Sequence, residues 1–312
     1  FIIGSLTSGA SLEVGSVTAA SSGVIAIASA ASSPALTTFK DNDTLFRTYP
    51  SDILQAVALV KAVSKAYGAT SWVTVGAINN SFGTGLATAF KKAWIKNGGH
   101  IGGTVLWNAG AASYDSEAAA LVKTKRSAFV FVDYPDSFAK LAPALARTKK
   151  WDPATTFMTE AFNDDSAVKT VGASLMNGIR GTSAKTNGTD SAGWNAAFVK
   201  AYPKNPGTFV DGSGFDAAVL SCLAGISATS TSSKALAKAL RNVGGVNGGA
   251  AYSWDQLTAA VKDVAAGKPV TYNGVWGYTK FDKAGDPLGG AFEVWSIKDG
   301  VILHDSKQDV QF

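Results

Sequence analysis

The side chains that could perform acid–base or metal chemistry are few and far apart in this sequence. It contains two histidines, His100 and His304, and one cysteine, Cys222. This inventory excludes a disulfide framework and a cysteine-rich metal site, and it leaves little for a histidine-based triad or metal centre. We expect both histidines at the surface, and we expect Cys222 to be buried because it lies in the apolar run 217–226. The sequence therefore predicts no catalytic constellation and no metal.

The glycine motifs of the sequence do not match nucleotide-binding loops. Gly83-Thr84-Gly85 opens a predicted helix after a predicted strand, but Thr88 stands where a dinucleotide fingerprint has its third glycine. The acidic partner of the ribose is missing as well. Gly267-Lys268 lacks the earlier glycine of a P-loop, and Pro269 replaces its Ser or Thr. A nucleophile elbow of the form Gly-x-Ser-x-Gly is also absent. We therefore expect no cofactor and no enzyme activity.

Two loops of small and hydroxyl-bearing residues could hold a small anion. They are residues 7–11 (Thr-Ser-Gly-Ala-Ser) and residues 30–33 (Ala-Ala-Ser-Ser), each between a predicted strand and a predicted helix. Hydroxyls and free backbone N–H groups ahead of a helix suit a carboxylate. Taken singly, each loop is equally well explained by serine capping of a helix. Two such loops on neighbouring parallel strands favour a binding crevice, because ligands bind at the carboxyl ends of these strands.

The composition is that of a globular α/β protein with one large or two medium domains. Of the 312 residues, 46% are hydrophobic and 16% are charged, whereas an average globular protein is roughly 25% charged. The apolar runs have the length of strands and fall short of the roughly 20 residues of a transmembrane helix. The net charge is +5 and the basic residues are scattered. Nucleic-acid binding is therefore not expected, because such proteins cluster Lys and Arg on one face.

Strand and helix patterns alternate along the first part of the chain. The predicted strands are 1–6 (buried), 24–28, 72–78, 101–107, 128–133, 156–160 and 179–183. The predicted helices between them are 11–22, 52–67, 83–97, 116–124 and 136–148. The alternation indicates βαβ units and parallel sheets. The later part has helical patterns at 192–202, 215–228, 233–243 and 254–265, and then predicted strands at 275–281 and 292–297.

Several short segments occur in a characteristic order over essentially the whole chain. They are 2–9 (IIGSLTSG), 28–37 (ASAASSPALT), 45–52 (LFRTYPSD), 80–86 (NSFGTGL), 134–137 (YPDS), 215–217 (FDA) and 277–286 (GYTKFDKAGD). In this order they resemble the substrate-binding proteins of branched-chain amino acid ABC transporters, the type I periplasmic binding proteins (extracellular ligand-binding receptors).

The resemblance implies an α/β fold of two Rossmann-like lobes joined by three hinge crossings. Carried onto this sequence, lobe one is 1–48 plus 184–289, and lobe two is 49–183 plus 290–312. Family members begin with a further strand and two helices of lobe one. The resemblance therefore implies that these N-terminal strand-helix units are missing from the 312 residues, and we expect them upstream or on a separate chain.

The resemblance also implies a set of ligand-binding residues. Those matched to the ligand's α-carboxylate are Leu6, Thr7, Ser8, Ala30 and Ser32. Glu160 is matched to the α-ammonium group. The aromatic walls are expected at Phe82, Tyr134 and Phe209, although each of them could equally be a core residue. Phe82 stands where relatives often carry Tyr, which removes one hydroxyl contact.

The function implied by the resemblance is capture of a small amino acid, branched-chain or otherwise aliphatic, by closure of the hinge, and its delivery to an ABC permease in the membrane. The protein is then expected to be a monomer in the periplasm or a cell-surface lipoprotein, although no signal sequence is visible in this chain. Two alternatives stay open: a ligand sensor of the same fold, or a binding protein for amides, urea or aromatic acids. The position of Glu160 distinguishes between these ligands. A buried carboxylate without a cationic partner is costly, so Glu160 facing the ligand favours one with an ammonium group.

Overall fold

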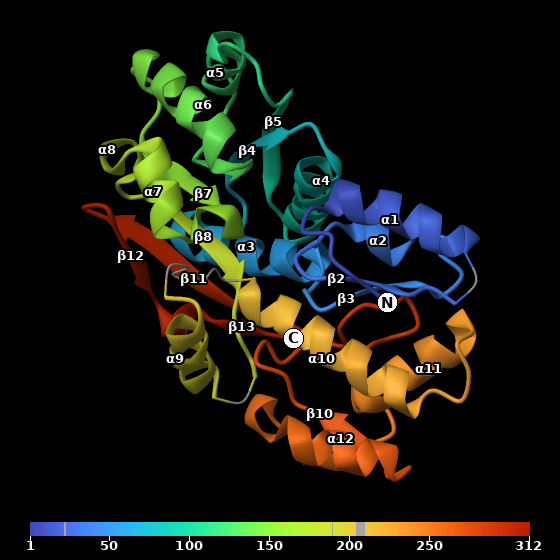
Figure 1. Ribbon diagram of the computed structural model, residues 1–312. Helices are drawn as coiled ribbons and strands as arrows, with labels where there is room; N and C mark the ends of the chain where they lie inside the picture. The colour runs from blue at the N-terminus through green and yellow to red at the C-terminus, as the bar shows by residue number, and fades with distance from the viewer. Residues whose placement is uncertain (22, 189, 204–209) are drawn as a thin grey trace. The chain divides into compact units, whose positions relative to one another are not determined.

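The structure, a computed structural model, describes residues 1–21, 23–188, 190–203 and 210–312. The chain forms two compact units (Figure 1). Unit 1 contains Phe1–Ser51 and Lys185–Gly290, and unit 2 contains Asp52–Ala184 and Ala291–Phe312. The chain thus passes between the units after Ser51, after Ala184 and after Gly290. The two lobes expected from the sequence, and their role as the two halves of a ligand site, stay a prediction.

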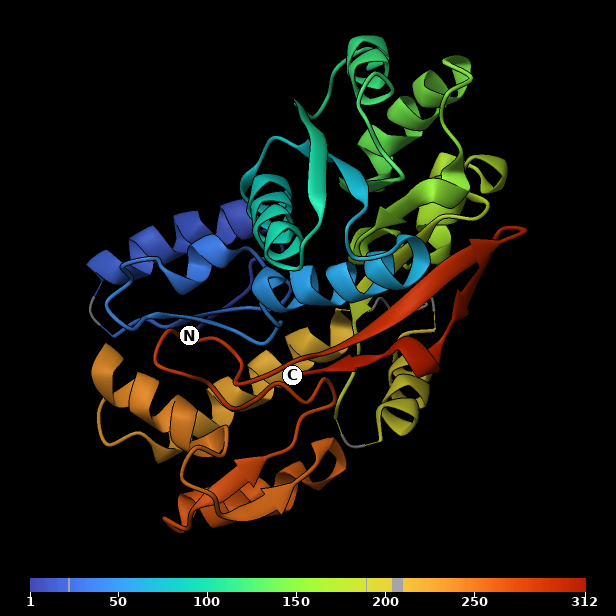
Figure 2. The ribbon, with the colours of Figure 1, turned by 180° about the vertical axis from the view of Figure 1, so that it is seen from behind.

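Unit 2 is built on one mixed sheet with the strand order β12-β11-β8-β7-β6-β4-β5, and β13 pairs with β11. Neighbours from β8 to β5 are parallel, whereas β11 is antiparallel to β8, β12 and β13. The red strands β11 and β12 are visible side by side in Figure 2. The strands are β4 (Trp72–Ile78), β5 (His100–Trp107), β6 (Ala128–Val132), β7 (Thr156–Met158), β8 (Arg180–Ala184), β11 (Ala291–Lys298), β12 (Val301–His304) and β13 (Val310–Gln311).

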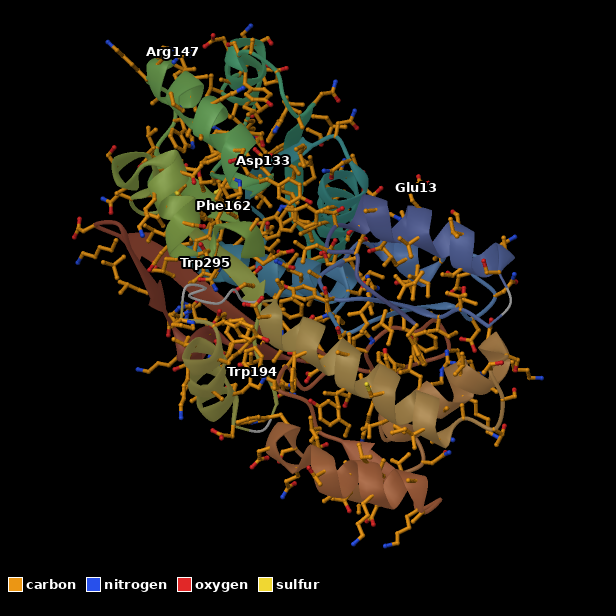
Figure 3. The ribbon with its side chains drawn as sticks, in the orientation of Figure 1. Glu13, Asp133, Arg147, Phe162, Trp194 and Trp295 are labelled. Carbon is orange, nitrogen blue, oxygen red and sulfur yellow. The ribbon has the colours of Figure 1, made fainter. Side chains whose placement is uncertain are left out.

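Helices cover both faces of this sheet, so its central strands are apolar on both sides. In β6, Val130 and Val132 join the apolar cluster under α3 and α4, while Phe129 and Phe131 join the cluster under α5, α6 and α7. Trp295, labelled in Figure 3, extends the second cluster from β11. The helices are α3 (Asp52–Tyr67), α4 (Ser81–Lys96), α5 (Asp115–Leu121), α6 (Pro135–Arg147), α7 (Asp165–Val171) and α8 (Ala173–Met176). Short 3-10 turns are η1 (Pro153–Thr155), η2 (Glu160–Phe162) and η4 (Ser306–Gln308).

Unit 1 contains a parallel sheet of order β1-β2-β3 and a parallel pair, β9 and β10. Its strands are β1 (Ile2–Ile3), β2 (Ala26–Ala28), β3 (Leu45–Arg47), β9 (Ala250–Tyr252) and β10 (Val270–Tyr272). Its helices are α1 (Ser8–Ala20), α2 (Pro34–Thr37), α9 (Ser191–Ala201), α10 (Asp211–Ser227), α11 (Ser233–Val243) and α12 (Leu257–Ala265), and η3 (Trp254–Gln256) precedes α12. Within the described residues of both units, every helix is too short or too polar to cross a bilayer.

Two predicted strands differ from the structure. The strand expected at 1–6 is present only at Ile2 and Ile3, which form β1, and its expected burial is wrong, since these two residues are 39% and 49% exposed. The strand expected at 275–281 is also wrong. There the backbone N–H groups of Val275 and Trp276 donate to the buried Asp216 carboxylate, each at 2.8 Å, so they are not available to a strand ladder.

The expectation of a buried Cys222 is wrong as well. Cys222 is exposed on α10, whereas its neighbours Ser221, Leu223 and Ala224 are buried. An amphipathic helix buries only one stripe of its surface. An apolar run such as 217–226 passes all round the helix, so some of its residues face away from that stripe. Both histidines are exposed, as expected.

Candidate functional site

The carboxyl edge of the unit 2 sheet carries polar residues from successive strands. Asn80 follows β4, Tyr134 follows β6 and Glu160 follows β7. Because the strands are parallel, their carboxyl ends meet at one edge, where ligands bind in open α/β sheets. Tyr134 is the N-cap residue of α6, and Glu160 opens η2. The edge thus brings two of the predicted site residues to the starts of neighbouring helical segments.

Glu160 is a buried carboxyl group with an amide partner. It is 6% exposed, and its Oε2 accepts a hydrogen bond from Gln55 Nε2 at 2.7 Å. The same Gln55 nitrogen donates to the carbonyl oxygen of Thr182 at 3.0 Å. Burial raises the pKa of Glu160 well above its usual range, and hydrogen bonds from its own backbone N–H and from Gln55 offset only part of this. Among the described residues, the buried Oε1 of Gln55 has no hydrogen-bond partner.

Tyr134 and Phe82 form an aromatic pair beside this carboxyl group. Their ring centroids are 5.4 Å apart with an interplanar angle of 32°. Burial raises the pKa of Tyr134 to about 12, and the charges of Glu160, Asp52 and Asp133 add to the rise. Tyr134 is therefore a neutral hydrogen-bonding side chain near Glu160. Phe82 is 5% exposed and belongs to the apolar cluster under α3 and α4.

The carboxyl edge of the β1-β2-β3 sheet in unit 1 carries the two small-residue loops. Thr7 is the N-cap residue of α1 but makes no capping hydrogen bond with its side chain among the described residues. The first-turn N–H groups of a helix have no partner within the helix. Ser8 Oγ accepts from the backbone N–H of Ser33 at 3.2 Å, so the first loop is bonded to the second. Ser8 and Ser32 are buried, whereas Leu6 and Thr7 are exposed and Ala30 is half-buried.

A buried ion pair holds the second loop in place. Arg47, 1% exposed, donates through Nε and Nη2 to the two Asp286 oxygens, each at 2.7 Å. Its Nη1 donates to the carbonyl oxygens of Ala31 at 3.3 Å and Ser33 at 3.0 Å. Arg47 therefore ties the backbone of the second loop to Asp286 through the carbonyl oxygens of Ala31 and Ser33.

The comparison with known families supplies the identity that this geometry suggests. The profile of the family described as periplasmic binding protein matches residues 1–283. The chain belongs to the periplasmic binding protein family. None of the curated proteins compared with it matches.

Solved structures show that this periplasmic binding protein has the type I fold. A leucine-binding protein from Thermotoga maritima superposes with a TM-score of 0.76 at 17% identity, covering 98% of this chain and 78% of that one. A branched-chain amino acid transporter substrate-binding protein from Streptococcus pneumoniae, in complex with isoleucine, gives 0.72 at 18% identity, covering 99% and 78%. An ABC transporter substrate-binding protein from Desulfitobacterium hafniense, complexed with Leu, gives 0.70 at 19% identity, covering 97% and 79%.

The predicted site residues of this binding protein fall into two groups. Leu6, Thr7, Ser8, Ala30 and Ser32 lie at the carboxyl edge in unit 1. Phe82, Tyr134 and Glu160 lie at the carboxyl edge in unit 2. Phe209 lies outside the described residues. The roles assigned to all of them stay predictions.

The sequence reasoning missed two polar residues of the unit 2 edge. Asp52 and Gln55, in the first turn of α3, are buried at 0% and 1% exposure, whereas the apolar Ile53 between them is 48% exposed. Their signal was present: they are three residues apart, so they lie on the same helix face as the buried Leu59. Polar residues are mostly exposed, so polar residues on a buried helix face are an informative sign of a site.

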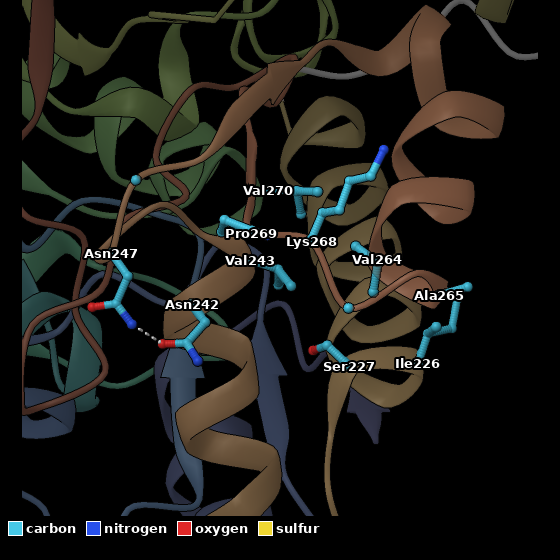
Figure 4. Close-up of a pocket in the computed structure, with 12 residues that line it drawn as sticks. Ile226, Ser227, Asn242, Val243, Asn247, Val264, Ala265, Lys268, Pro269 and Val270 are labelled. Carbon is cyan, nitrogen blue, oxygen red and sulfur yellow. Dashed lines mark hydrogen bonds between the residues drawn. The ribbon is translucent and has the colours of Figure 1, made fainter.

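Two further features of the molecule bear on its chemistry. No group of three or more His, Cys, Asp or Glu in the described ranges is placed to hold a metal ion. A pocket of about 430 Å³ in unit 1 lies where α10, α11 and α12 end, next to Asn242 and Asn247 (Figure 4). Asn247 Nδ2 donates to Asn242 Oδ1 there at 2.6 Å. None of the predicted site residues lines this pocket.

Proposed function

We propose that this protein captures a small amino acid, branched-chain or otherwise aliphatic, and delivers it to an ABC permease in the membrane. The family is one of binding proteins, and the three similar structures are described as leucine-binding, isoleucine-bound and leucine-bound. In this proposal the protein performs no catalysis. It acts as a monomer in the periplasm or as a cell-surface lipoprotein.

The observation that carries the proposal is the buried Glu160 carboxyl. An ionised carboxylate this deeply buried is unfavourable unless a cation pairs with it, and burial raises its pKa accordingly. An α-ammonium group would supply both the charge and three N–H donors. The buried Gln55 Oε1, unpartnered within the described residues, offers a second acceptor next to it.

The opposite end of the ligand suits the unit 1 edge. Its α-carboxylate would accept hydrogen bonds from the Ser8 and Ser32 hydroxyls and from the N–H groups at the start of α1, with Leu6, Thr7 and Ala30 shaping the loops. Closure of the lobes, 1–48 plus 184–289 against 49–183 plus 290–312, would bring the two ends together around the ligand. Phe82 and Tyr134 would then line the space for the ligand's side chain.

A thermal-shift panel followed by calorimetry tests this proposal. The panel contains the twenty amino acids, small amides, urea and aromatic acids. A ligand that binds only the folded state raises the unfolding midpoint by mass action, so we expect a rise of several degrees with Leu, Ile or Val. Glu160→Gln should abolish it. Glu13→Gln is the matched control, because Glu13 is exposed on α1 (Figure 3).

The other outcomes separate the alternatives. A shift only with ligands that lack an ammonium group would contradict the role of Glu160 and favour amides, urea or aromatic acids. A protein that binds leucine but does not stimulate leucine uptake by an ABC permease reconstituted in vesicles would favour a sensor of the same fold.

A further inference from the structure

A cluster of polar side chains in unit 2 adjoins the turn that carries Glu160. Asn163 Nδ2 donates to Glu293 Oε1 at 2.7 Å and to Ser183 Oγ at 2.7 Å. Ser183 Oγ donates to the same Glu293 oxygen at 3.0 Å. On the other side of the carboxylate, His304 Nδ1 lies 3.1 Å from Glu293 Oε2. Glu293 thus has inward partners, Asn163 and Ser183, and an outward partner, His304, which is half exposed.

The strands that carry this cluster are those by which the chain leaves and re-enters unit 2. Ser183 on β8 and Glu293 on β11 stand opposite each other in antiparallel register. Unit 2 ends at Ala184, the last residue of β8, and resumes at Ala291, the first residue of β11. The hydrogen bond between Glu293 and Ser183 therefore joins β11 to β8 close to the two points where the chain passes between the units.

The turn itself has few bonds of its own. In η2 the Phe162 N–H donates to the Thr159 carbonyl oxygen at 3.1 Å, and the Asn163 N–H donates to the Glu160 carbonyl oxygen at 3.0 Å. A single 3-10 turn has poor hydrogen-bond geometry and little intrinsic stability. Phe162 is fully buried and anchors the turn on the core side (Figure 3). The Asn163 side chain anchors its end to Glu293 and Ser183.

We propose that Glu293 is a positioning residue: through Asn163 it fixes the Glu160 turn to β8 and β11 and so links occupancy of Glu160 to the strands at whose ends the chain leaves and re-enters unit 2. This inference rests on the proposed function for its binding consequence. Hydrogen bonds to a carboxylate are stronger than neutral ones. A glutamine at position 293 retains an oxygen that can accept both inward bonds, whereas an alanine accepts neither.

The test compares Glu293→Ala with Glu293→Gln, and His304→Ala is the control that removes only the outward partner. Leucine affinity is measured by calorimetry, and amide hydrogen exchange at residues 162 and 163 is measured in the ligand-free protein. For Glu293→Ala we expect affinity to fall about tenfold or more, which the loss of hydrogen bonds to a charged group warrants, and exchange at both amides to accelerate. Glu293→Gln and His304→Ala should stay within about threefold of the wild type in affinity, since they retain the inward bonds.

The outcomes distinguish this inference from the proposed function. Unchanged exchange in Glu293→Ala, or a glutamine variant as impaired as the alanine variant, would overturn the positioning role. If Glu293→Ala does not fold, Asn163→Ala removes the bonds that join the half-buried turn to Glu293 and Ser183, keeps the Ser183–Glu293 bond, and replaces Glu293→Ala in both measurements. If the wild type binds no amino acid, the proposed function fails, and the exchange measurement alone decides the role of Glu293.

Discussion

The carboxyl edges of the two units are built from opposite chemistry. Unit 1 presents the hydroxyls of Ser8 and Ser32 and the first-turn N–H groups of α1, which are donors toward an anion. Unit 2 presents the carboxyl group of Glu160 and the Oε1 of Gln55, which are acceptors toward a cation. A zwitterion needs donors at one end and acceptors at the other. The two edges thus differ in the sign of the ligand group that each could bind.

The edges also differ in how their buried charges are compensated. In unit 1 the Asp286 carboxylate is paired with Arg47 within hydrogen-bond distance at both oxygens. In unit 2 Glu160 has a neutral amide partner and a raised pKa. A buried carboxyl whose pKa is raised to about 7, as that of Glu160 is, titrates near neutrality. The pH dependence of binding should therefore come from unit 2.

The largest expected effect is the loss of the unit 1 ion pair. Arg47→Ala leaves Asp286 buried without its cation and releases the carbonyls of Ala31 and Ser33. Breaking a buried pair costs about 3–5 kcal/mol, so the free energy of unfolding measured in urea should fall by that order. Arg147→Ala is the control: the Arg147–Asp115 pair is 62% exposed on both sides, and exposed pairs contribute about 0–1 kcal/mol. Equal losses in both variants would refute the structural role of Arg47.

The next effect concerns the stability of unit 2 against pH. Asp133 is fully buried, and burial raises its pKa to about 7, against a hydrogen bond from the Ser137 hydroxyl that favours the ionised form. Between the ordinary value of 3.8 and about 7 the folded protein holds a proton that the unfolded chain has lost. Stability therefore declines as pH rises through this window and levels off above it.

Asp133→Asn should remove that part of the decline, on the order of 3 kcal/mol. The measurement is the free energy of unfolding of the ligand-free protein at pH 5 and pH 8. Asp136→Asn is the matched control and should keep the wild-type profile, because Asp136 lies three residues further on, exposed in the first turn of α6. A profile unchanged by Asp133→Asn would contradict the raised pKa.

A smaller effect is expected in the pH dependence of ligand affinity. An ammonium group binds ionised Glu160, whose pKa is raised in the free protein by burial. Affinity should therefore rise with pH, by up to tenfold per unit below that pKa, and reach a plateau above it. Calorimetry in buffers of different ionisation enthalpy should detect proton release on the rising limb. Proton release that persists in Glu160→Gln would assign the effect to another group.

The alternation of segments predicted most of the elements, because hydrophobic periodicity reports which side of an element is buried. The helix at 52–67 and the strand at 72–78 coincide with α3 and β4. The prediction failed at 275–281, where the buried side chain of Asp216 takes up backbone N–H groups. Such a tertiary hydrogen bond, from a residue far away in the sequence, leaves no periodic signal.

The candidate site could be predicted in part only. Glu160 and Ser8 could be predicted because both follow strands, and ligands bind at the carboxyl ends of strands in open α/β sheets. Gln55 lies in the first turn of a helix, and its contact with Glu160 joins residues that are 105 positions apart. The bond between Asn163 and Glu293 likewise joins residues that are 130 positions apart. No local pattern in a single sequence shows which distant residues meet, so the partners of Glu160 could be identified only from the structure.

The smallest expected effect tests whether Tyr134 acts through its ring or through its hydroxyl. Tyr134→Phe retains the ring that packs against Phe82 at 5.4 Å and removes only the polar tip. If the ring walls the ligand's side chain, leucine affinity should change by less than about threefold, since an interaction of about 0.5–1 kcal/mol is at stake. Tyr134→Ala, which removes the ring, should weaken binding further. A loss in Tyr134→Phe as large as in Tyr134→Ala would show that the hydroxyl contacts the ligand and would extend the polar character of the unit 2 edge to its aromatic pair.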